Sequence, residues 1–153
     1  MHDPRRPAFP FDELRRRPDV EAPNLLAFDA TDRLLGARGV DQAEARGLAG
    51  RDIAVIGDAY GAVTLQLAAA GLTGVRVHQD LVTGRAALAG NAAALGLTGT
   101  YVGHELDSGL LSGARLVLAQ LPRGLAELEE LADAVARWAA DDVVLVAGGR
   151  VKH

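Results

Sequence analysis

The chain has 153 residues, enough for one well-buried core and too few for two ordinary domains. Hydrophobic residues make up 49% and charged residues 24%, and the net charge of -4 argues against a generally basic nucleic-acid-binding protein without excluding a local basic patch. There is no cysteine, which excludes disulfides, thiolate zinc sites and cysteine nucleophiles and is compatible with the cytosol, the location that we expect. No apolar run approaches the roughly 18 residues of a membrane span, so no membrane association is expected.

Residues 1–50 lack a regular rhythm, and we expect them to form an arm and short helices that pack on the core. The stretch from residue 1 to residue 10 holds three of the six prolines, which is typical of an arm or linker. Further on, the apolar pattern predicts a helix over about residues 28–36 that ends at Gly36. A second short helix is expected over about residues 41–46, stopped by Gly47.

Three consecutive arginines follow the arm. Arg15, Arg16 and Arg17 stand beside Asp12 and Glu13, and a solvated polar face is the favoured interpretation. The alternative is a basic patch that contacts RNA phosphates.

A strand, a glycine-bearing turn and a helix begin the regular part of the chain. Ile53–Ile56 is a short apolar run, residues 57–61 carry glycine at both ends, and a small-residue helix then runs toward Gly71. This order opens an α/β unit of the nucleotide-binding type.

The same strand-helix step then recurs. Helices are predicted over about residues 83–95 and 125–138, and the clearer one repeats its apolar positions every three or four residues. The remaining strands are predicted at Val75–His78, Tyr101–Val102, Arg115–Ala119 and Val143–Ala147. Such alternation demands right-handed crossovers, so we predict one α/β domain with a mostly parallel sheet in the order 3-2-1-4-5, flanked by helices, with its core in residues 51–153.

Any ligand of such a sheet would lie at the strand ends beside the first and fourth strands. The residues that would border it are Gly57, Asp58, Gly61, Asp80 and Gln120. Ala59 stands between the two glycines, so the turn is not the dinucleotide pattern G-x-G-x-x-G. Asp80 is placed to bind ribose hydroxyls, but an N-cap of the following helix is the favoured interpretation.

Four stretches resemble a known family: PDVEAPNLLAFDATDRLL, VIGDAYGAVTLQLA, LAQLPRGLAELEELADAV and VVLVAGGRVKH. They are similar to the N-terminal domain of the ribosomal RNA guanine-N2 methyltransferases, which have two tandem class I methyltransferase-like domains. The resemblance implies a Rossmann-like fold that has lost its S-adenosylmethionine site. It also implies that a C-terminal domain binds S-adenosylmethionine and carries an Asn-Pro-Pro-Phe catalytic motif.

The departures from a working class I methyltransferase agree with this resemblance. Val55 replaces the acidic residue that would meet the methionine ammonium, and Ala59 replaces the central glycine. Asp58 adds a negative charge where the methionine carboxylate would approach. The catalytic motif is replaced by the segment that runs from Gln120 to Arg123, whose Leu121 cannot accept a hydrogen bond from an amine.

We therefore expect a non-catalytic domain without cofactor or catalytic residues, which helps to recognise ribosomal RNA and docks a C-terminal catalytic domain. The alternatives are a small-molecule methyltransferase that binds S-adenosylmethionine and a plain protein-interaction module. No metal site is expected, because the four histidines show no ligand spacing with carboxylates.

The last predicted strand has an expected consequence of its own. A complete class I sheet has two further strands, but only residues 148–153 follow Val143–Ala147. An apolar strand at a sheet edge is a template for another strand, so we expect this chain to self-associate there.

Overall fold

Five parallel strands form one sheet in the order β3-β2-β1-β4-β5, which confirms the predicted topology. The computed structural model describes residues 8–19, 21–22, 26–122 and 124–149. The strands are β1 Ile53–Ile56, β2 Val75–His78, β3 Tyr101–Gly103, β4 Leu116–Gln120 and β5 Val144–Gly148. Because β1 and β4 are neighbours, the connections reverse direction between them, which places the switch point of the sheet there.

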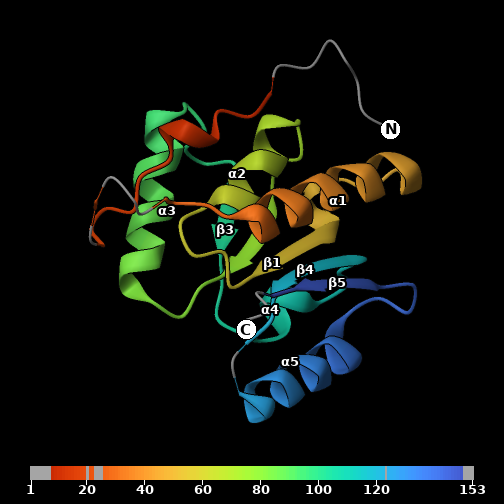
Figure 1. Cartoon of the computed structure of the whole chain (residues 1–153). Helices are drawn as coiled ribbons and strands as arrows, with labels where there is room; N and C mark the ends of the chain where they lie inside the picture. The colour runs from red at the N-terminus through yellow and green to blue at the C-terminus, as the bar shows by residue number, and fades with distance from the viewer. Residues whose placement is uncertain (1–7, 20, 23–25, 123, 150–153) are drawn as a thin grey trace.

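Helices cover both faces of the sheet, so the molecule has three layers (Figure 1). One face carries α1 Ala30–Arg46, α2 Ala62–Ala69 and α3 Val82–Ala94, and the other carries α4 Ser108–Leu111 and α5 Leu125–Trp138. Two short 3-10 helices, η1 Phe11–Glu13 and η2 Gly50–Asp52, complete the elements of the described residues.

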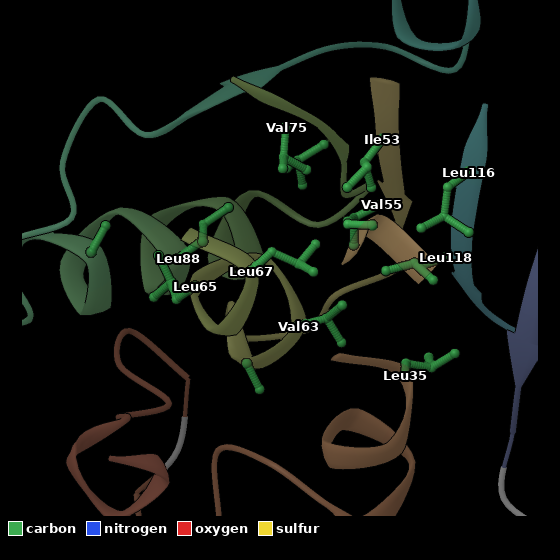
Figure 2. Packing of buried hydrophobic residues seen from close by; sticks show 14 of the residues in the cluster. Leu35, Ile53, Val55, Val63, Leu65, Leu67, Val75, Leu88, Leu116 and Leu118 are labelled. Atoms are coloured by element: carbon green, nitrogen blue, oxygen red, sulfur yellow. The ribbon is translucent and has the colours of Figure 1, made fainter. Parts of the chain in front are cut away.

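The two central strands supply both halves of the core, because successive side chains of a strand point to opposite faces. Ile53 and Val55 pack with α1, α2 and α3, as Figure 2 shows for the larger of the two clusters. Ala54 and Ile56 pack with α4 and α5 on the other face. A strand buried on both faces reads as a continuous apolar run, which is why β1 and β4 were recognisable in the sequence.

Helix α1 differs from expectation. The predicted pair of helices over 28–36 and 41–46 is wrong, since one continuous helix spans Ala30–Arg46 and ends at Gly47 in the left-handed conformation. Gly36 and Gly39 lie inside it and are buried. A Cβ atom at Gly39 would come within 2.6 Å of Leu118 and 2.9 Å of Leu67, so this glycine allows the helix to approach the sheet closely.

Two smaller differences concern the second half of the chain. The segment between β3 and β4, where no helix was predicted, contains α4, which Asp107 caps by accepting a hydrogen bond from the Leu110 amide at 3.2 Å. Strands β4 and β5 also begin and end one residue later than predicted. The helices of the described residues are each too short or too polar to span a lipid bilayer.

Candidate functional site

A crevice of about 850 Å³ opens at the carboxyl ends of β1, β2 and β4. This is the place where parallel α/β sheets bind ligands. Of the five residues predicted to border it, Gly57, Asp80 and Gln120 line it. Asp58 and Gly61 belong to the same turn as Gly57, but they are buried and do not line the crevice.

The two glycines of the turn serve internal packing. Gly57 and Gly61 have φ angles of 80° and 96°, which favour glycine. A Cβ atom at Gly57 would lie 3.2 Å from the Cβ of Gln120, and one at Gly61 would lie 2.7 Å from a methyl carbon of Leu88. The space that each glycine leaves is therefore already filled by this chain.

Asp58 accepts hydrogen bonds from backbone amides in the first turn of α2. Its carboxylate accepts hydrogen bonds from the backbone amides of Thr64 at 2.8 Å and Val63 at 3.3 Å. Burial raises the pKa of Asp58, while these amide donors oppose the rise. The N-terminal amides of a helix are a natural anion site, and here the anion is a side chain of the chain itself.

Asp80 does not cap α3, so the favoured interpretation of this residue is wrong. The N-cap position is Leu81, and no side chain caps the helix there. Instead, an oxygen of the exposed Asp80 lies 2.8 Å from Nε2 of the buried His78. The other ring nitrogen of His78 lies 2.9 Å from the carbonyl oxygen of His104. The carboxylate of Asp80 is thus held at the end of β2 and faces the crevice.

The side chain of Gln120 contacts Asp32, a residue that the sequence did not identify as part of the site. Its side-chain amide donates a hydrogen bond to the carboxylate of Asp32, in the first turn of α1. Asp32 also accepts from the backbone amide of Asp29 at 2.9 Å, and Asp29 returns the contact, which forms a capping box. The D-x-x-D spacing signals such a helix start, but nothing in the sequence shows that Asp32 is buried.

The surroundings of Asp32 also weaken its acidity. Burial raises its pKa to about 7, and the neighbouring charges of Asp58 and Asp29 add to the rise. Three carboxyl groups therefore gather where α1 crosses the ends of β1 and β4. Such a cluster repels a further anion.

The crevice is acidic along its remaining border. Glu105 follows β3, and Glu127 and Glu130 project from the first turns of α5. With Asp80 they are the charged carboxylic side chains of the lining, and within the described part of the chain no lysine or arginine lines it. The described residues also contain no group of three or more side chains arranged to hold a metal ion.

The arginine segment lies away from the crevice, and its central member is fixed. Arg16 donates to the hydroxyl of Tyr60 from Nη2 at 2.9 Å and from Nε at 3.1 Å. The Tyr60 hydroxyl in turn donates to Asp19 at 2.7 Å. Burial raises the pKa of Tyr60, which keeps the phenol in the protonated form that this bond requires. The Arg16 side chain is therefore part of the fold.

Arg15 and Arg17 keep exposed side chains. The backbone of Arg15 is tied to α3, because its amide donates to Asn91 Oδ1 and its carbonyl oxygen accepts from Asn91 Nδ2, both at 2.8 Å. Asn91 also donates to the carbonyl oxygen of Tyr60 at 2.8 Å. This buried asparagine anchors the segment, and the alanine-rich sequence around it gave no sign of that role.

Residues 7–153 match the family model described as the RLMG N-terminal domain. No curated protein matches the chain.

Solved structures of other proteins share the fold. Precorrin 8W decarboxylase from Methanobacterium thermoautotrophicum is similar with a TM-score of 0.65 and 19% identity, over 92% of this chain and 71% of that one. The ribosomal protein L11 methylase from Lactobacillus delbrueckii subsp. bulgaricus is similar with a TM-score of 0.64 and 18% identity, over 83% of this chain and 64% of that one. An S-adenosylmethionine-dependent methyltransferase from Clostridium acetobutylicum is similar with a TM-score of 0.58 and 12% identity, over 78% of this chain and 50% of that one. This chain therefore spans half of the length of that methyltransferase. At these identities the likeness is one of fold, and the fold is methyltransferase-like.

S-adenosylmethionine fits this crevice poorly. Asp80 offers an acceptor for ribose hydroxyls, and acidic side chains favour a sulfonium and an ammonium group. The methionine carboxylate, however, would compete for donors of the described residues that are already in use, because Asp58 accepts from two α2 amides and the Gln120 amide donates to Asp32. The glycines leave no empty cradle either, so the described residues supply no catalytic step through this cofactor.

Proposed function

Because this chain belongs to the RLMG N-terminal domain family, we propose that it is the non-catalytic N-terminal domain of a methyltransferase that acts on guanine N2 of ribosomal RNA. In this role it helps to recognise the RNA and docks a C-terminal domain that binds S-adenosylmethionine and carries out the transfer. The family match over residues 7–153 is the observation that carries the proposal.

The state of the strand-end turn supports the non-catalytic part of this proposal. A cofactor carboxylate at the start of α2 would have to displace Asp58, which is buried and accepts from two helix amides. A target amino group after β4 would need a side chain that is free to orient toward it, and the amide of Gln120 is fixed by its bond to Asp32. Both positions at which such an enzyme would work are filled by contacts that stabilise the fold.

Calorimetric titration with S-adenosylmethionine tests this part directly. We expect no binding at low-micromolar concentration of the cofactor. The variant Ala59→Gly is a useful companion, because it restores the central glycine and should still not bind while Asp58 remains in place. Low-micromolar affinity of the unaltered chain would overturn the proposal.

The second candidate is a methyltransferase that acts on a small molecule. The crevice volume of about 850 Å³ favours it, since pockets for small ligands are commonly of this size. This candidate requires the cofactor binding that the first one excludes, so the same titration separates them. A plain protein-interaction module is the third candidate, and it predicts that ribosomal RNA fragments do not bind.

The exposed Arg15 and Arg17 support the RNA-recognition part of the proposal, because cationic side chains of this kind contact phosphates. Filter binding of a ribosomal RNA fragment, compared with double-stranded DNA of equal length, tests it. Equal affinity for the two polymers would indicate charge attraction without recognition of RNA.

A further inference from the structure

The crevice at the strand ends has an apolar floor and an apolar rim. Ile56, Leu106 and Leu131 form part of the floor. On opposite sides of the opening stand Leu81 and Leu121, which are 64% and 45% exposed. Large aliphatic side chains that remain this exposed around one hollow are typical of a surface that another molecule covers.

The charges around this apolar surface have one sign. Asp80 and Glu105 lie on the β2 and β3 side, and Glu127 and Glu130 lie on α5 across the opening. The lining includes His78, which contacts Asp80, but no lysine or arginine of the described lining residues offsets the other carboxylates; Arg123 lies outside the described residues. An occupant must therefore bring positive charge as well as apolar groups.

We propose that this crevice binds a basic segment of a protein partner, in which aliphatic side chains alternate with lysine or arginine. The aliphatic groups would cover Leu81 and Leu121, and the cationic groups would pair with Asp80, Glu127 and Glu130. RNA is disfavoured as the occupant, because its phosphates would face four carboxylic side chains. The inference rests on the proposed function in one respect, since S-adenosylmethionine would compete for the same space.

Four probes separate the contribution of positive charge from the contribution of aliphatic side chains. Fluorescence anisotropy at low ionic strength would compare a labelled lysine–leucine peptide, a glutamate–leucine peptide of equal length and leucine content, oligolysine and oligouridylate. We expect the lysine–leucine peptide to bind most tightly, and we expect added salt to weaken its binding. Oligolysine should bind more weakly because it lacks the apolar groups.

Matched variants then locate the site. Glu127→Gln combined with Glu130→Gln removes two carboxylates of the lining and should weaken peptide binding about fivefold, as expected for partly exposed ion pairs. Glu129→Gln changes an exposed acid of the same helix that does not line the crevice, and it should leave binding unchanged. Leu121→Ser should weaken binding about tenfold, whereas Leu145→Ser, at a similarly exposed leucine of β5, should not.

Several results would overturn the inference. These are no binding of the lysine–leucine peptide, equal binding of the glutamate–leucine peptide, tighter binding of oligouridylate at this site, or equal effects of the Glu129→Gln control. A parallel titration with S-adenosylmethionine keeps the two proposals apart. Cofactor binding that displaces the peptide would contradict the proposed function. If neither the peptide nor S-adenosylmethionine binds, the result contradicts this inference alone.

Discussion

The side-chain amide of Gln120 donates a hydrogen bond to the carboxylate of Asp32, although the two residues lie 88 positions apart in the chain. The contact joins the last residue of β4 to the first turn of α1. It uses the position at which a base methyltransferase would hold its target amino group to fix a helix over the sheet. Burial and the neighbouring carboxyl groups of Asp58 and Asp29 nevertheless favour the protonated form of Asp32.

Stability should therefore depend on pH through Asp32. Its pKa is raised to about 7 by burial, above the ordinary value of 3.8, so the folded state retains a proton that the unfolded state releases. The stability that this proton contributes is complete below about pH 4 and is lost as the pH rises through about 7. Asp32→Asn should remove this loss, because the asparagine amide replaces the protonated acid.

Urea denaturation at several pH values measures the effect. Relative to the unaltered chain, the unfolding free energy of Asp32→Asn should increase by up to roughly 4 kcal/mol between about pH 4 and about pH 8. Asp41→Asn, at an exposed aspartate of the same helix, serves as the control. A difference between Asp32→Asn and the unaltered chain that does not change with pH would show that Asp32 is not the titrating group.

The sheet was predictable because its signal is local. Continuous apolar runs at β1 and β4, separated by helices, leave few topologies once crossovers must be right-handed. The family was also recognised correctly from sequence stretches that include residues 118–135. Helix α1 was not recovered, because Gly36 and Gly39 look like breaks until their tertiary neighbours are known.

These two glycines should respond differently to alanine. At Gly39 a Cβ atom meets the methyl groups of Leu118 and Leu67, which are fully buried and cannot yield, so Gly39→Ala should destabilise the chain by about 1 kcal/mol after its gain in helix propensity. At Gly36 the obstacle is the end of the Gln66 side chain, which can rotate away. Gly36→Ala should then stabilise the chain by about 0.5 kcal/mol. Denaturation midpoints that move equally for both variants would contradict this account.

The details of the crevice were less predictable than the fold. The sequence places Asp58 and Asp80 correctly in loops after β1 and β2, but it does not show which group each carboxylate contacts. Asp58 points to the amides of α2, and Asp80 pairs with His78 instead of capping α3. Asp32 reaches the site from a helix distant in sequence. Such choices depend on tertiary contacts, which override local preferences.

The arginine segment yields a prediction that separates stability from RNA binding. Arg16→Gln breaks the contacts with Tyr60 and should lower the denaturation midpoint, while the salt dependence of RNA binding stays unchanged. Changing Arg15 and Arg17 together to glutamine should lower the midpoint less, because Nη1 of Arg15 donates only to the carbonyl oxygens of Asp12 and Leu14, at 2.8 and 3.0 Å. It should flatten the plot of log affinity against log salt concentration by about one unit for each phosphate that an arginine no longer neutralises.

Arg38→Gln provides the control for this experiment, because Arg38 is an exposed arginine of α1 outside the segment. A slope that Arg38→Gln changes as much as the double variant does would indicate unspecific attraction. A slope that no variant changes would return Arg15 and Arg17 to the solvated polar face that the sequence favoured.

The outer edge of β5 leads to a prediction about association. Strand β5 pairs with β4, and no other strand of the described residues pairs with it. Leu145 is 41% exposed, and β5 contains no charged residue that would deter a further strand. We therefore expect light scattering by this chain to indicate self-association as its concentration rises.

Leu145→Lys tests which edge is responsible, because a lysine on an edge strand opposes pairing. The variant should remain monomeric over the concentrations at which the unaltered chain associates. The opposite edge supplies a matched control in Val102→Lys, since Val102 is 50% exposed on the three-residue strand β3, which is too short to recruit a partner well. If Val102→Lys abolishes association and Leu145→Lys does not, the contact lies at β3. If the unaltered chain stays monomeric at high concentration, the edge of β5 does not act as a template.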